Sequence, residues 1–277
     1  MSKNISEPTP IKQRFIACVQ STGRVGKSMV ADGILSWLSF AGIPHAAIDT
    51  DVQHHTLSDR YKMHLLDATS SEDEFAELLE NLPESPTLMV DFPGNKTAKI
   101  LEFADHFQML KSFRASGIRP TLLIFTADDA TAKDSALETL EFFGDAADYL
   151  LIENSARFKS DSFKAIPLYD EFIARKSPTL VVPRISAGTL NAWEAAQHRL
   201  GEYLSLDKIS KAQGLSVTSV LELSGVRDRF LVGCEDCASH LIPDQALIKN
   251  KVQRAGSDTS GKRPLNRLGN PLLVRKN

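Results

Sequence analysis

Short apolar runs that end at polar residues recur along roughly the first two hundred positions of the chain. Because continuous apolar runs bounded by polar residues are typical of strands buried on both faces, they predict a mainly parallel sheet. The expected strands are residues 15–19, 46–48, 87–90, 121–125, 149–152 and 179–182.

Between these runs, apolar residues return at helical spacing. The pattern predicts helices at residues 27–40, 72–82, 97–116, 131–145 and 192–204. Alternating strands and helices predict an α/β fold, a doubly wound parallel sheet with helices on both faces. Ligands of such folds bind at the carboxyl ends of the strands, where Asp49, Asp91 and Glu153 are expected.

The pattern changes after about residue 205. Residues 207–230 have a helical pattern with expected breaks at Gly214 and Gly225, and the chain becomes polar and basic further on. We therefore divide it into a leader (1–13), an α/β domain (14–204), a helical appendage (205–245) and a basic, flexible tail (246–277).

Composition narrows the class of protein. A chain of 277 residues that is 42% hydrophobic, with a net charge of -3, is not typical of a disordered protein. Its overall charge predicts neither nucleic acid nor an anionic membrane as partner, so such affinity needs a local patch. Three cysteines, no secretion signal and no apolar stretch of about 18 residues indicate a cytoplasmic protein without a membrane span.

The sequence Gly-Arg-Val-Gly-Lys-Ser lies between the first expected strand and the first helix. It offers what a polyphosphate needs: backbone N–H donors, a helix N-terminus, a lysine and a hydroxyl for Mg²⁺. The strict phosphate-loop pattern is not met, because Ser21 occupies the position of its first glycine. The alternative is a glycine turn with an exposed lysine. The candidate ATP-binding residues here are Gly23, Arg24, Val25, Gly26, Lys27, Ser28 and Met29.

Two acidic motifs follow expected strands. Asp49-Thr50-Asp51-Val52-Gln53 follows the second strand, and Asp91-Phe92-Pro93-Gly94 follows the third. A carboxylate at a strand end can hold Mg²⁺ directly or through water. Ser28, Asp49 and Asp91 are therefore the candidate metal residues.

With these motifs in this order, residues 14–204 resemble the ParA/MinD superfamily of deviant Walker-type ATPases, in particular members that act in plasmid partition and transfer. The resemblance implies that Lys27 contacts the β- and γ-phosphates and that Ser28 ligates Mg²⁺. It further implies that Asp51 orients the attacking water and Asp91 supports the metal. Asn154 matches an asparagine that contacts adenine; its other interpretation is a polar strand end.

The chain departs from the family pattern inside the phosphate loop. Thr22 stands where the family has a signature lysine that reaches the partner subunit's phosphates, and Arg24 replaces a loop glycine. One hypothesis is that Arg24 acts as an arginine finger, which makes Lys27, Asp51 and Arg24 the candidate catalytic residues. The other is that Arg24 faces solvent and the protein binds ATP but hydrolyses it poorly.

The resemblance implies an ATP- and Mg²⁺-dependent ATPase that forms a homodimer on nucleotide. It would serve plasmid or DNA segregation, stability or conjugative transfer, with slow hydrolysis stimulated by DNA or a partner protein. Two alternatives remain open. One is a nucleotide-gated regulator or adaptor with little hydrolysis, and the other is a ligase similar to dethiobiotin synthetase, whose loop also has a T-x-x-V-G-K pattern.

The C-terminal region offers three weaker signals. Cys234, Cys237 and His240 have a spacing that zinc could use, but a fourth ligand is not evident, so a reduced surface pair is the preferred interpretation. Residues 209–221 have a helix-turn-helix pattern with Ser216 as N-cap. The tail could bind DNA phosphates without sequence preference through Lys249, Lys251, Arg254, Lys262, Arg263 and Arg267.

Overall fold

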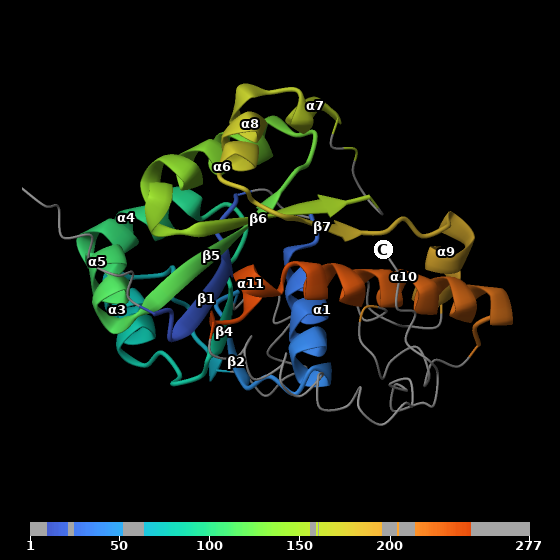
Figure 1. Ribbon diagram of the computed structural model, residues 1–277, viewed down its shortest axis with the longest axis horizontal. Coiled ribbons are helices and arrows are strands. Elements are labelled where there is room, and N and C mark those ends of the chain that lie inside the picture. The colour runs from blue at the N-terminus through green and yellow to red at the C-terminus, as the bar shows by residue number, and fades with distance from the viewer. Residues whose placement is uncertain are drawn as a thin grey trace, which may run out of the picture.

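The chain folds around a parallel sheet. The computed structural model describes residues 10–21, 25–51, 64–155, 159, 161–195, 204 and 214–244. In this part of the chain, seven strands form one sheet in the order β3-β2-β4-β1-β5-β6-β7, and every neighbouring pair is parallel. Helices cover both faces of it (Figure 1). The predicted doubly wound α/β fold is thereby confirmed.

The six strands predicted from apolar runs are all present. A seventh, β3, is a two-residue edge strand, too short to leave a pattern in the sequence. The strands are β1 (Gln13–Cys18), β2 (His45–Asp49), β3 (His64–Leu65), β4 (Thr87–Asp91), β5 (Ile118–Phe125), β6 (Asp148–Asn154) and β7 (Thr179–Val182).

Helices join most of the strands, and further helices follow the last strand. These are α1 (Lys27–Phe40), α3 (Glu72–Glu80), α4 (Thr97–His106), α5 (Met109–Ser116), α6 (Ala130–Phe143), the 3₁₀ turn η1 (Gly144–Ala146), α7 (Asp161–Lys164), α8 (Pro167–Ala174), α9 (Ala187–Ala195), α10 (Val217–Asp236) and α11 (Ala238–Leu241). Among the described helices, none combines the length and apolar character needed to cross a bilayer.

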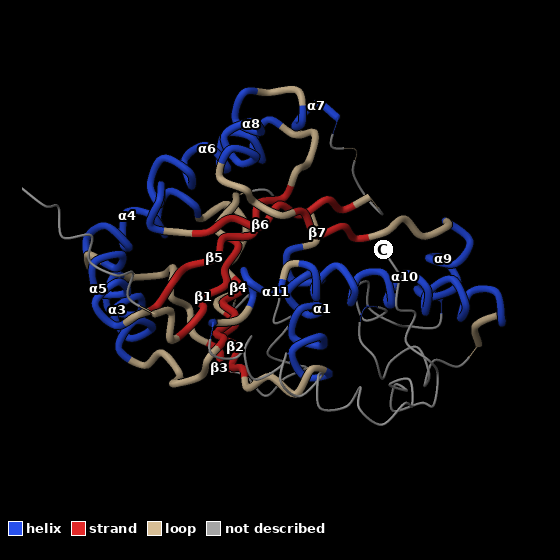
Figure 2. The backbone as a smooth tube through the Cα atoms, viewed as in Figure 1, coloured by secondary structure: helices blue, strands red, loops and turns tan. Residues whose placement is uncertain are grey.

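Two apolar cores lie on opposite faces of the sheet. Alternate residues of β1 show the division, since Phe15 and Ala17 pack with α3–α8, whereas Ile16 and Cys18 pack with α1, α9, α10 and α11. Figure 2 shows the strands as a layer between these two groups of helices. Strands buried on both faces explain why the apolar runs are continuous rather than alternating.

Three helix predictions need correction. The helix expected at 97–116 is two helices, because the backbone of Gln108 adopts a left-handed conformation (φ 48°) between α4 and α5. The helix expected at 192–204 begins earlier, as α9 at Ala187, and residues 196–203 lie outside the described residues. Gly225 does not break its helix, since α10 runs without interruption from Val217 to Asp236.

Helix α10 packs on the sheet and on α1. Its buried residues Leu223, Val226 and Phe230 belong to the same apolar core as Ile34 of α1 and Leu180 of β7. The segment predicted to be a helical appendage therefore contributes to the core of the α/β domain. The domain boundaries, and the tail as a separate flexible part, stay predictions.

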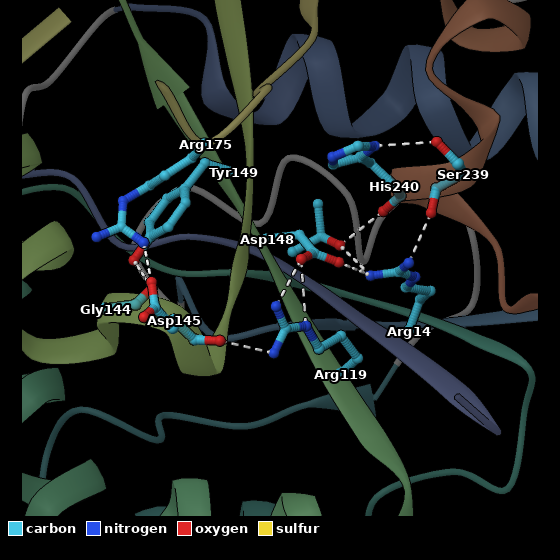
Figure 3. Close-up of polar contacts among 10 residues, drawn as sticks. Arg14, Arg119, Gly144, Asp145, Asp148, Tyr149, Arg175, Ser239 and His240 are labelled. Carbon is cyan, nitrogen blue, oxygen red and sulfur yellow. Dashed lines mark hydrogen bonds and ion pairs between the residues drawn. The ribbon is translucent and has the colours of Figure 1, made fainter. Parts of the chain in front are cut away.

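A polar cluster fixes α11 to the amino ends of the central strands (Figure 3). Arg14 of β1, only 4% exposed, pairs with Asp148 and donates to the carbonyl oxygen of Ser239 at 2.6 Å. The Thr121 hydroxyl donates to the carbonyl oxygen of His240 at 2.6 Å, and Arg119 donates to the Asp148 carboxylate at 2.6 Å. These bonds hold α11, near the end of the described chain, against the central strands β1 and β5.

Candidate functional site

The strand order reverses its direction of winding between β1 and β4. The connection from β1 leads past β4 to β2, whereas the connection from β4 leads past β1 to β5. The direction of winding therefore reverses between these two strands, and ligands of open parallel sheets bind at such a reversal. The predicted phosphate loop follows β1, and Asp91 is the last residue of β4.

The described end of the loop has the geometry of an anion site. Gly26 immediately precedes α1 with φ +96°, a left-handed conformation that favours glycine. Among the described residues no side chain caps the start of α1, and its first turn contains no acidic residue. The first N–H groups of the helix and its dipole therefore favour a negatively charged ligand.

Lys27 begins this helix and is half-buried. Its Nζ donates to the carbonyl oxygen of Gln20 at 3.2 Å, which holds the ammonium group just beyond the end of β1. Gln20 is itself fully buried, and its side-chain amide donates to the carbonyl oxygens of Phe125 and Ala132. Gln20 thus joins the start of the loop to β5 and α6.

The carboxyl group of Asp91 lies at the centre of the acidic residues. It is 4% exposed and hydrogen-bonds the Ser28 side chain. Burial raises the pKa of Asp91 to about 7, the charges of Asp49 and Asp51 add to the rise, and Ser28 and Lys27 oppose it. The predicted phosphate lysine, metal hydroxyl and strand-end carboxyls are therefore brought together.

The second acidic motif is held against β4. The Thr50 hydroxyl donates to the carbonyl oxygen of Asp91 at 2.8 Å, and the backbone N–H of Asp51 donates to a carboxylate oxygen of Asp49 at 3.1 Å. Asp49 is fully buried, whereas Asp51 is half-buried. Asp51 is thus the more accessible of the two carboxylates.

Asn154 ends β6 and contacts the phosphate loop. Its Nδ2 donates to the carbonyl oxygen of Val25 at 2.8 Å, and its side chain is buried. Its Oδ1 is buried and has no hydrogen-bond partner among the described residues. Sequence reasoning paired Asn154 with a nucleotide base; the contact of this side chain with the loop was not predicted.

Sequence reasoning also missed a second set of contacts to the loop. The Ser21 hydroxyl donates to the Thr97 hydroxyl at 2.7 Å, and the backbone N–H of Asn95 donates to the carbonyl oxygen of Ser21 at 2.9 Å. Asn95 adopts a left-handed conformation (φ 62°) to make this turn. These residues are more than 70 positions from Ser21, so no local pattern could have paired them.

Several candidates lie outside the described residues. They are Thr22, Gly23 and Arg24 of the loop, the first half of the helix-turn-helix pattern, and the tail residues proposed for DNA. The predicted N-cap at Ser216 is confirmed, because its hydroxyl accepts from the backbone N–H of Ser219 at 3.1 Å.

The interpretation of the cysteines as a surface pair was wrong. Cys234, a residue of α10, and Cys237, which follows that helix, are free thiols buried in the core, with exposed fractions of 0% and 2%. Burial raises the pKa of Cys237 to about 12 and raises that of Cys234 as well. Among the described residues, no three His, Cys, Asp or Glu side chains are grouped so as to hold a metal ion by themselves.

Comparisons with known proteins include solved structures of low sequence identity. No family model and no curated protein matches the chain. Among solved structures, the chain is similar to FlhF complexed with GMPPNP and Mg²⁺, at 15% identity and a TM-score of 0.36 over 57% of this chain and 62% of that chain. The chain therefore spans less than two thirds of that FlhF chain.

Two further similarities are to a cell-division protein of Aquifex aeolicus. MinD matches at 15% identity and a TM-score of 0.42, over 77% of this chain and 97% of that chain. The MinC:MinD complex matches at 13% identity and a TM-score of 0.42, over 77% of this chain and 96% of that chain.

Proposed function

We propose that this chain is a nucleotide-binding protein of the ParA/MinD type that binds ATP with Mg²⁺ and hydrolyses it slowly. The observation that carries the proposal is the grouping of Lys27 and Ser28, at the start of α1, with the buried Asp91 carboxyl at the end of β4, where the winding of the sheet reverses. A hydroxyl, a carboxyl and an amine at an uncapped helix start suit a metal-bound polyphosphate.

The donor set fits Mg²⁺. This ion takes oxygen ligands and is held by one or two carboxylates together with substrate phosphates and water, so it does not require three carboxylates from the protein. Ser28 would be a direct ligand and Asp91 would support the metal, with Asp49 adding negative charge nearby. When bound, Mg²⁺ would neutralise charge on the phosphate oxygens.

The other site residues have distinct proposed roles. Lys27 would bind the outer phosphates, and Asp51, the more accessible carboxylate, would orient the attacking water. Arg24 would supply the cation that the missing lysine at Thr22 does not, by contacting the phosphates of a partner subunit.

We further propose that nucleotide binding stabilises a homodimer that acts in plasmid or DNA segregation, stability or transfer. The support is the motif resemblance together with the basic tail, which offers DNA phosphates eight lysines and arginines against one acid from Lys249 onward. A partner protein would couple this switch to its DNA or transfer machinery.

One observation favours a second candidate, a nucleotide-gated adaptor. Thr22 cannot neutralise charge on a phosphate, so the chain would bind ATP, change its assembly and hydrolyse very little. The two candidates differ in turnover rather than in binding.

The experiment that tests the proposal measures ATP hydrolysis and molecular mass of the purified protein, with and without duplex DNA. For the ATPase we expect turnover that rises with DNA, an ATP-bound dimer trapped by Asp51→Ala, and loss of turnover and dimerisation in Arg24→Ala. Full turnover and dimerisation in Arg24→Ala would remove the proposed role of that arginine. A protein that binds ATP without turnover would favour the adaptor, and one that binds no nucleotide would exclude both.

A further inference from the structure

The structure gives the side chain of Asn154 a specific contact with the phosphate loop. Its Nδ2 donates to the carbonyl oxygen of Val25 at 2.8 Å, although 129 positions separate the two residues. Val25 is fully buried, so this carbonyl group lies where a lost hydrogen bond is not readily replaced by water. The bond therefore joins the end of β6 to the loop.

Gly26, the next residue of the loop, leaves room for the Asn154 side chain. A Cβ placed on Gly26 would come within 2.7 Å of Asn154 Nδ2 and 3.2 Å of the Met29 methyl group. The absence of a side chain at Gly26 therefore lets the amide reach Val25, while the left-handed backbone of Gly26 turns the chain into α1. The Asn154 amide thus fills the space that a side chain at Gly26 would need.

We propose, on the basis of the proposed nucleotide site, that Asn154 is a positioning residue that fixes Val25 and Gly26, the described end of the phosphate loop, for binding of the polyphosphate. Through Val25 and Gly26 it fixes where the first N–H groups of α1 and the Lys27 amine point. The chemical group that depends on it is the polyphosphate, which every nucleoside triphosphate shares. Its contribution is therefore independent of the base.

This role makes a quantitative prediction for ligands with and without a base. Binding of ATP, GTP and inorganic tripolyphosphate, each with Mg²⁺, would be measured by calorimetry for the full chain and for Asn154→Ala. Loss of one buried hydrogen bond that orders the loop corresponds to roughly tenfold weaker binding. We expect this loss to be similar for all three ligands, so that the ratio of ATP to GTP affinity does not change.

The matched control is Thr126→Val. Thr126 is also buried at the carboxyl end of a central strand, and its hydroxyl donates to the carbonyl oxygen of Ile152, a residue of β6, at 3.2 Å. We expect its tripolyphosphate affinity to match that of the wild type. In the ligand-free protein, amide hydrogen exchange across residues 25–30 should be faster in Asn154→Ala than in Thr126→Val.

Three outcomes decide the matter. If Asn154→Ala weakens ATP binding but leaves tripolyphosphate binding intact, or if it weakens neither, the positioning role is wrong although the nucleotide site stands. If the wild-type protein binds none of the three ligands, the proposed function fails, and this inference fails with it. Should Asn154→Ala not fold, Asn154→Asp applies the same test, because it keeps the shape and replaces the Nδ2 donor with an acceptor.

Discussion

Two aspartates show how neighbouring residues decide the charge of a carboxyl group. Burial of Asp91 raises its pKa to about 7, and the nearby carboxylates Asp49 and Asp51 reinforce the rise. Burial acts in the same direction on Asp148, but hydrogen bonds and charges from Arg119 and Arg14 outweigh it and hold the pKa of Asp148 below its usual value. The group of carboxyls around Asp91 therefore suits the binding of a cation. The Asp148 carboxylate already has its cationic partners, Arg119 and Arg14.

Asp148 should therefore stabilise the fold at neutral pH but not in acid. Because its pKa is lower in the folded chain, its contribution is present above the unfolded pKa of about 4 and is lost as the pH falls through the folded value. We expect Asp148→Asn to lower the free energy of unfolding at pH 7 by about 1–3 kcal/mol. Urea denaturation as a function of pH should show the two proteins converging in acid.

A histidine and an exposed ion pair nearby bear on this measurement, and the exposed ion pair provides its control. His240 also faces Asp148, and burial lowers the pKa of that histidine, with Arg14 and Arg119 acting in the same direction. Asp145, which pairs with Arg175, is 95% exposed, so Asp145→Asn should change stability little at any pH. A constant difference between wild type and Asp148→Asn down to pH 3 would contradict the assigned ion pairs.

At the scale of elements, the sequence predicts what local patterns encode. Buried strands such as β4 were found because every residue from Thr87 to Asp91 is buried. The break between α4 and α5 was missed because Phe107 continues the apolar spacing while Gln108 turns the backbone. Likewise, the motifs of the loop, Asp49 and Asp91 indicate a candidate site that stays a prediction. The contact of Asn154 with Val25 could not be predicted, since long-range packing creates it.

The contact between α1 and α10 gives a prediction at this scale. A Cβ on Gly33, inside α1, would come within 2.6 Å of the Phe230 ring and 3.0 Å of Leu204. Alanine would gain up to about 1 kcal/mol of helix propensity, yet overpacking costs about 1–3 kcal/mol. We therefore expect Gly33→Ala to lower the melting temperature, and Phe230→Leu to lessen the effect of Gly33→Ala in the double variant.

Gly188 provides the matched comparison within another helix. It lies in α9, and a Cβ there would meet nothing within 4 Å, so Gly188→Ala should leave the melting temperature unchanged or raise it. An equal response of Gly33→Ala and Gly188→Ala would mean that α10 does not pack on α1 as described.

At the scale of the whole molecule, the residues of the proposed nucleotide site and the point where the basic tail begins lie at opposite ends of the strands. The candidate nucleotide residues gather at the carboxyl ends of the strands, around Ser28 and Asp91. The described chain ends at Asp244, shortly after Leu241, whose carbonyl oxygen accepts from the Thr87 hydroxyl at the amino end of β4. The basic tail therefore follows a segment that lies at the amino ends of the strands, opposite the proposed nucleotide site.

This separation predicts that DNA binding can be removed without loss of nucleotide binding. A chain truncated after residue 245 lacks the eight lysines and arginines of the tail. We expect it to lose most affinity for duplex DNA, with a shallower dependence on salt, because each neutralised phosphate contributes about 0.9 to the slope of log K against log salt concentration. Its ATP affinity should equal that of the full chain, because all candidate phosphate and metal residues precede Ser155.

A full-length chain with Lys249, Lys251, Arg254, Lys262, Arg263 and Arg267 replaced by glutamine should behave like the truncated one, which separates charge from length. Unchanged DNA affinity and salt slope after truncation would place DNA binding elsewhere on the molecule, or show that the tail only solubilises it.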